Sequence, residues 1–225
     1  MEARKLLNKK LIKYLLIFSL ILIVILQIVS CQKPKETPPE KKVIPKGIGV
    51  NIHGNLNEQE IKMMKKSGVK YVRVDLFWEV IEKQKGHYNF EQYDKLSKML
   101  KENGIKPFYI LDYSNKLYEE NNSIVTGKGR TAFANYARAA VKRYNGQHAI
   151  WEIWNEPNLE MFWNSQPSYD DYGLLVEKVA PIIKKHDKTG VVVAPALSGI
   201  SDDSLQWLEQ LLKNKKVTTD LDAIS

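Results

Sequence analysis

From residue 47 to residue 225, short apolar runs alternate with amphipathic segments, and this alternation leaves few folds open to the chain. The apolar runs are rich in β-branched and aromatic residues, which is typical of β-strands. The segments between them carry apolar residues at helical spacing and open on capping residues such as Asn57. The sequence predicts strands at 47–54, 69–78, 105–114, 148–158, 190–199 and 221–225, and helices at 57–68, 89–104, 131–146, 169–187 and 202–215.

Strict alternation of strand and helix predicts parallel strands, which need helices to cover them. An open doubly wound sheet and a (β/α)8 barrel both satisfy this requirement. The first predicted helix is not opened by a G-x-G-x-x-G sequence, so a dinucleotide-binding sheet lacks its main support. Barrel active sites are built at the carboxyl ends of several strands. Four successive predicted strands carry polar groups near that end: His53, Arg73, Asp112 with Tyr113, and Asn155 with Glu156.

The spacing of the predicted strands indicates how much of a barrel is present. Each strand–helix unit takes about 35 residues, so eight units would need roughly 280 residues. The sequence offers 179 residues after position 46. We therefore expect an α/β fold, a (β/α)8 TIM barrel present only up to about strand six. The expected barrel domain is 47–225, incomplete at its C-terminus.

The segment 151–158, WEIWNEPN, ends a buried-looking strand on an amide and a carboxylate. Pro157 removes the next donor of the strand ladder and ends the pairing where the polar groups begin. Glu156 is thereby held on a rigid strand end. Partial desolvation by Trp151 and Trp154 would raise its pKa and allow it to act as an acid near neutral pH.

The same segment resembles the Asn-Glu-Pro signature of the retaining (β/α)8 glycoside hydrolases typified by families 5 and 39. The stretches 68–96 and 104–113 are similar to those enzymes as well, and the resemblance covers 47–225. It implies a glycosidase that cleaves O-glycosidic bonds of a poly- or oligosaccharide by double displacement. Glu156 would be the general acid/base, Asn155 would bind the sugar 2-hydroxyl, and Arg73 would orient the nucleophile.

The retaining mechanism needs a second carboxylate about 5 to 5.5 Å from the first. The resemblance places this nucleophile after strand seven, outside the predicted elements. Glu152 is a poor substitute, because four strand residues put it about 13 Å from Glu156. Two alternatives to an active glycosidase therefore stay open: a noncatalytic carbohydrate-binding lipoprotein, and an inactive enzyme fragment.

Other rim residues have both a functional and a structural interpretation. His53 and Tyr113 are expected to contact substrate or to serve as satisfied rim residues. Trp163 either stacks on a sugar face or packs within its loop. Arg73, in an apolar strand, requires an acidic partner: the nucleophile, Asp75 or another structural acid. No cofactor or metal is expected, because the four histidines show no ligand spacing.

The N-terminus has the pattern of a secretory signal. Five basic residues between Arg4 and Lys13 precede an uncharged apolar stretch, which is short for a membrane-spanning helix of about 20 residues. IVSC at 28–31 resembles a bacterial lipobox and contains the only cysteine, Cys31. We expect a signal peptide at 1–30 and lipidation of Cys31, with an uncleaved anchor as the alternative. Residues 31–46 are expected to be a disordered tether, which would hold the domain at the cell envelope, facing the periplasm or exterior.

The net charge of +8 does not indicate nucleic-acid binding. Residues 1–46 contain ten Lys/Arg and three Asp/Glu, and the remaining residues contain 24 and 23. Because the predicted domain is nearly neutral, it lacks the basic surface that phosphate backbones require. The expected partners are a carbohydrate and a membrane, and no nucleic acid.

Overall fold

The computed structural model describes residues 46–164 and 166–225. Its sheet is five-stranded and wholly parallel, in the order β1-β2-β3-β4-β5, so that each strand pairs with the next one in the sequence. This order confirms the predicted alternating α/β fold. The strands are β1 (Ile48–Asn51), β2 (Val69–Phe77), β3 (Lys106–Asp112), β4 (Ile150–Ile153) and β5 (Val191–Val193).

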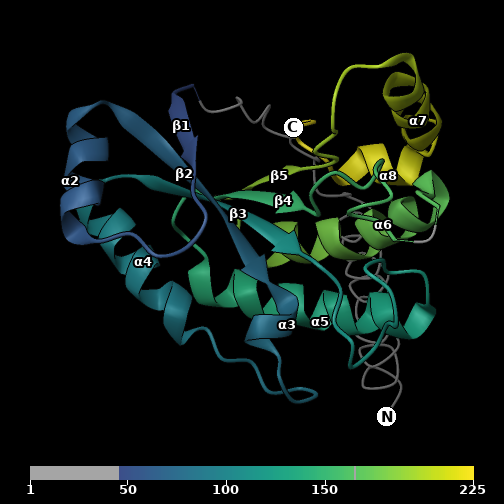
Figure 1. Cartoon of the computed structure of the whole chain (residues 1–225), viewed down its shortest axis with the longest axis horizontal. Coiled ribbons are helices and arrows are strands. Elements are labelled where there is room, and N and C mark those ends of the chain that lie inside the picture. Colours follow the sequence, from purple (N-terminus) through teal and green to yellow (C-terminus); the bar gives the residue numbers. More distant parts are fainter. Residues whose placement is uncertain (1–45, 165) are drawn as a thin grey trace, which may run out of the picture. The chain divides into compact units, whose positions relative to one another are not determined.

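Helices follow the strands and lie around one side of the sheet (Figure 1). Asn57 caps α2 as the sequence predicted, and together with Glu60 it forms a capping box. The short α3 was not predicted, and α5 begins four residues earlier than expected. The helices are α2 (Glu58–Lys66), α3 (Trp78–Ile81), α4 (Glu91–Asn103), α5 (Gly127–Tyr144), α6 (Tyr169–His186), α7 (Asp202–Leu212) and α8 (Lys215–Asp220).

The two faces of the sheet have different side chains. On β2, Val72, Val74 and Leu76 belong to the large core shared with the helices. The alternate residues belong to the opposite face, because successive strand side chains alternate. On that inner face Tyr71, Ile150 and neighbouring residues of β5 form a second, smaller apolar cluster. Arg73, Asp75, Asp112 and Glu152 follow on the same face toward the carboxyl ends of the strands, so the inner face changes from apolar to charged.

The predicted sixth strand is present as a single parallel bridge between Ala223 and Val193 of β5. The Asp222 carboxylate accepts a hydrogen bond from the Val192 N–H at 2.9 Å, and the Ala194 N–H donates to the Ala223 carbonyl at 3.2 Å. The segment therefore continues the order of the sheet beyond β5.

The predictions for the signal peptide at 1–30 and for Cys31 lie outside the described residues, as does the tether apart from its last residue. Across 46–164 and 166–225, every helix is too short or too polar to cross a membrane.

Candidate active site

Glu156 lies just beyond the end of β4, where the backbone turns out of the strand. Trp154 and Glu156 have φ angles of +67° and +50°, a left-handed conformation that is unfavourable for residues with a side chain. The Glu156 N–H donates to the Ala196 carbonyl at 2.9 Å, and Asn155 forms a parallel bridge with Ala196. These contacts with the segment after β5 hold the strained turn in place.

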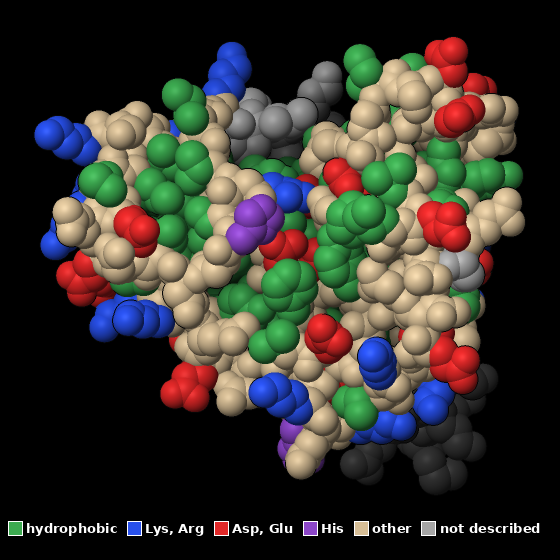
Figure 2. All heavy atoms as spheres, viewed as in Figure 1, with side chains coloured by type: hydrophobic (Ala, Val, Ile, Leu, Met, Phe, Trp, Pro, Cys, Tyr) green, Lys and Arg blue, Asp and Glu red, His purple; other side chains and the backbone are tan. Residues whose placement is uncertain are grey.

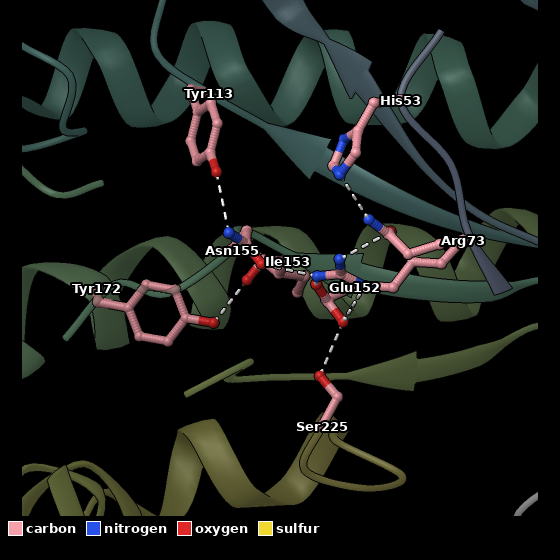
Figure 3. Close-up of polar contacts among 9 residues, drawn as sticks. His53, Arg73, Tyr113, Glu152, Ile153, Asn155, Tyr172 and Ser225 are labelled. Atoms are coloured by element: carbon pink, nitrogen blue, oxygen red, sulfur yellow. Dashed lines mark hydrogen bonds and ion pairs between the residues drawn. The ribbon is translucent and has the colours of Figure 1, made fainter. Parts of the chain in front are cut away.

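Arg73 is the centre of the polar network on the inner face (Figure 3). Its guanidinium donates from Nε and Nη2 to the two carboxylate oxygens of Glu152. Nη2 also donates to Oδ1 of Asn155 at 2.7 Å, and Nη1 to Oδ1 of Asn51 at 3.2 Å. A single planar cation thus links β1, β2, β4 and the residue before Glu156.

Glu152 is the acidic partner that Arg73 requires. Its side chain is 1% exposed and also accepts a hydrogen bond from the Ser225 hydroxyl at 2.8 Å. Burial raises the pKa of Glu152 above its ordinary value, although the guanidinium opposes this. Among the described residues, the acid paired with Arg73 is therefore Glu152 and not Asp75. The expected role of Arg73 in orienting a nucleophile stays a prediction.

Tyr113 fixes the other side of the Asn155 amide. The Asn155 Nδ2 donates to the Tyr113 hydroxyl at 3.0 Å, so Arg73 and Tyr113 together determine how the amide is oriented. The Tyr113 ring stacks on Phe162 and packs edge-on against Trp154. Burial raises the pKa of the Tyr113 hydroxyl, which keeps it protonated.

The Glu156 carboxylate is available to a ligand. Its side chain is partly exposed, and among the described residues it has no side-chain hydrogen bond or ion pair. Trp151 does not border it, because the indole N–H donates to Asp187 at the opposite end of the strands. The prediction that Trp151 desolvates Glu156 is therefore wrong.

His53 and Trp163 lie in contrasting environments. His53 is exposed and shares a 3.2 Å hydrogen bond between its Nε2 and the Asn51 amide, so it is accessible at the rim. Trp163 is 0% exposed and packs edge-on between Trp154 and Tyr172. A sugar cannot reach its faces in this arrangement, which favours the packing interpretation of Trp163.

Figure 2 shows acidic, basic and histidine side chains beside one another near the middle of the viewed face, flanked by hydrophobic ones.

Two polar residues of the inner face were not predicted to act in the site: Asn51, which contacts both Arg73 and His53, and Asp75. Asn51 is two residues from His53, and Asp75 is two residues from Arg73. In a strand, residues two apart point to the same face, and this spacing is the feature of the sequence that could have identified them. Within 46–164 and 166–225, no group of three or more His, Cys, Asp or Glu is placed to hold a metal ion.

Residues 38–219 match the family model described as Cellulase (glycosyl hydrolase family 5). The chain belongs to glycosyl hydrolase family 5. The match spans the sheet and the Asn-Glu-Pro turn, so Glu156, Asn155 and Arg73 are part of the family 5 region.

Solved structures similar to this family 5 chain are also glycoside hydrolases. A family 39 glycoside hydrolase from Bacteroides cellulosilyticus WH2 is 26% identical with a TM-score of 0.57, over 68% of this chain and 34% of that one. A family 39 β-xylosidase from Caulobacter crescentus is 22% identical with a TM-score of 0.60, over 84% and 47%. A psychrophilic family 10 endo-β-1,4-xylanase is 18% identical with a TM-score of 0.63, over 79% and 62%. The chain thus matches less than two thirds of each of these structures, and its sheet is part of their TIM-barrel fold.

Proposed function

We propose that the protein is a retaining glycoside hydrolase that cleaves O-glycosidic bonds of a poly- or oligosaccharide, with Glu156 as general acid/base. The observation that carries the proposal is the placement of Glu156. Within 46–164 and 166–225 its carboxylate has no side-chain partner, and it follows directly after Asn155, whose amide is fixed by Arg73 and Tyr113. Membership of family 5 supports the same reaction.

In the first step Glu156, as the acid, donates its proton to the departing glycosidic oxygen while a carboxylate nucleophile attacks the anomeric carbon. The C–O bond to the leaving group breaks and a glycosyl ester forms. In the second step Glu156, now the base, removes a proton from water, which attacks the anomeric carbon and releases the nucleophile. The resemblance assigns the nucleophile to strand seven, which lies beyond the five described strands and the Ala223 bridge.

The substrate class follows from the rim and from the relatives. Asn155 and Tyr113 offer amide and hydroxyl groups, and exposed His53 offers a ring nitrogen, all suited to sugar hydroxyls. Similar structures are named as a β-xylosidase, an endo-β-1,4-xylanase and a β-galactosidase. We therefore propose β-linked glycosides as substrates, bound without a metal or cofactor.

A second candidate is carbohydrate binding without hydrolysis. It is favoured by the position of Glu152, the acid nearest to Glu156 along the strand. Glu152 is buried and bound by Arg73 and Ser225, so it is unsuited to attack a sugar. The binding groups at the rim do not depend on a nucleophile.

We further propose that Cys31 is lipidated after removal of residues 1–30, which would place the enzyme at the cell envelope near extracellular carbohydrate. The IVSC sequence and the preceding basic and apolar stretches support this. The test is detergent phase partitioning of the chain expressed in a bacterium. Wild type should enter the detergent phase and Cys31→Ser should not; equal partitioning of the two would contradict lipidation.

The test of the proposed function is ¹H NMR of the sugar released from p-nitrophenyl β-D-glucoside and p-nitrophenyl β-D-xyloside. In a protein that also carries the strand-seven nucleophile, a β-anomer as first product, lost in Glu156→Ala, is expected. Glu160→Ala, an exposed acid on the same loop, is the matched control and should retain activity. Release of the α-anomer would contradict the retaining mechanism. No release, together with measurable binding of cellobiose or xylobiose, would instead support the binding candidate.

A further inference from the structure

Two acidic residues of the inner face lie side by side above the Arg73 network. Asp75 of β2 is in register with Ile110 of β3, and Asp112 follows Ile110 by two residues on the same face. This register makes the two residues diagonal neighbours on adjacent strands, so their carboxyl groups share the same face of the sheet. A hydrogen bond between the two carboxyl groups requires one of them to hold a proton, because two ionised carboxylates offer no donor.

Asp112 is the member of the pair that holds a proton. It is 0% exposed, and neither of its oxygens receives a hydrogen bond from a donor group of the described residues. An ionised carboxylate in such a place is costly. Burial first, and then the charges of Asp75 and Glu152, raise the pKa of Asp112 well above its ordinary value, and Arg73 only partly opposes this. The other titratable groups that face Asp112 are the phenols of Tyr93, Tyr113 and Tyr136.

Asp75 is partly exposed on the inner face of the sheet. Apart from Asp112, its side chain has no hydrogen-bond or ion-pair partner within 46–164 and 166–225. It follows Arg73 by two residues on β2, so it lies on the same face and one step nearer the carboxyl end of the strand. Its carboxyl oxygens are therefore available to accept hydrogen bonds on the inner face. Hydroxyl donors are what such a carboxylate binds strongly.

We propose that Asp75 is a further sugar-binding residue, which accepts a hydrogen bond from a substrate hydroxyl while protonated Asp112 donates to its other oxygen and fixes its orientation. This inference rests on the proposed carbohydrate-binding function. It assigns Asp75 a direct contact with the sugar and Asp112 a positioning role. No bond is made or broken by either residue.

Asp112→Asn separates positioning from ionisation. The amide keeps an N–H donor for Asp75 and has no charge, so it imitates the protonated acid. Asp75→Ala instead removes the acceptor. In isothermal titration of the 225-residue chain with cellobiose and with xylobiose, Asp75→Ala should weaken binding of the preferred disaccharide about tenfold, because the hydrogen bond from a sugar hydroxyl to the Asp75 carboxyl group is lost. Asp112→Asn should bind within about threefold of wild type. Asp203→Asn, an exposed acid on α7, is the matched control and should leave binding unchanged.

A second measurement tests the shared proton without any ligand. Infrared spectra at pH 7 should show the carbonyl stretch of a protonated carboxylic acid in wild type and in Asp203→Asn, and the band should be absent from Asp112→Asn. Its absence from wild type would overturn the assigned positioning role. If Asp75→Ala loses its cooperative melting, Asp75→Asn replaces it and should bind several-fold more weakly than wild type.

The outcomes distinguish this inference from the proposed function. Folded wild type that binds neither disaccharide would contradict both. Binding that is lost in Asn155→Ala and unchanged in Asp75→Ala would overturn the role of Asp75 alone. Two results together would show that the carboxyl pair is a cation site instead. Ca²⁺ or Na⁺ would stabilise wild type and not Asp75→Ala, and Asp75→Ala would leave sugar binding unchanged.

Discussion

Arg73 of β2 reaches Glu152 of β4 across the intervening strand β3, and its guanidinium lies over the Phe108 ring at 5.7 Å from the centroid. The pair joins strands that are not neighbours, and it leaves one donor of the same guanidinium for Asn155. The ion pair of the sheet and the orientation of the candidate sugar-binding amide therefore depend on one side chain.

Removal of this cation should destabilise the fold. Arg73→Ala leaves Glu152 buried without its partner, and breaking a buried pair costs about 3 to 5 kcal/mol. Because the Arg73 side chain is 25% exposed, we expect a loss somewhat below this range, about 2 to 3 kcal/mol, in urea unfolding. Arg73→Ala combined with Glu152→Gln should recover part of the loss. A single variant within about 0.5 kcal/mol of wild type would contradict the network described for Arg73.

Tyr113→Phe should weaken sugar binding more than it weakens the fold. The variant removes the hydroxyl that accepts from Asn155 and keeps the ring stacked on Phe162. Loss of one hydrogen bond is worth about 1 kcal/mol, so the dissociation constant for a bound disaccharide should rise about fivefold. Tyr169→Phe, a partly exposed tyrosine of α6, is the control for titration calorimetry. Equal affinity of Tyr113→Phe and wild type would show that the amide needs no such support.

Trp163→Phe should have the opposite effect. Trp163 is fully buried between Trp154 and Tyr172, so the smaller ring leaves a cavity and should lower the free energy of unfolding by about 1 to 3 kcal/mol. Disaccharide affinity should stay within about twofold of wild type, since the ring is not accessible. A large loss of affinity with unchanged stability would restore the sugar-stacking role of Trp163.

Asp187 should contribute stability that depends on pH. Burial raises its pKa, but hydrogen bonds from Trp151, Thr189 and Gly146 outweigh this and hold the pKa below its ordinary value. Since the folded pKa is the lower one, the contribution is complete above the ordinary pKa of 3.8 and is lost as the pH falls below it.

Asp187→Asn should therefore lose about 1 to 3 kcal/mol at pH 7, and the difference from wild type should shrink in thermal melts between pH 5 and pH 2. Asp170→Asn, at the exposed start of α6, serves as the control. A difference that stays constant over this pH range would contradict the assignment to Asp187.

The sequence predicted the order of the elements because the signals for each element are local. The Asn57 cap and the alternating residues of β2 need no tertiary information. The sequence missed α3, whose four residues follow β2 directly and are too few to show a period. It also predicted β4 too long, because the left-handed turn at Trp154 ends the strand before Pro157.

The candidate site was predicted in part for the same reason. Glu156 and Asn155 stand in a short contiguous motif, and Arg73 was recognised by its order in the chain. The partner of Arg73 depends on which residues of β2 and β4 meet across β3, which is a question of register that the sequence alone does not answer. The burial of Trp163 and the proximity of Asp75 to Asp112 are likewise properties of packing between segments far apart in the sequence.

The most direct test of the central claim compares two substrates in Glu156→Gln. A general acid contributes about 10²- to 10⁴-fold to a step that needs protonation of the leaving group. In a protein that also carries the strand-seven nucleophile, we predict a loss of this size in kcat/KM for an unactivated disaccharide, cellobiose or xylobiose, and a much smaller loss in the first step for the corresponding 2,4-dinitrophenyl β-glycoside. Equal losses on both substrates would contradict the assignment of Glu156 as the general acid/base.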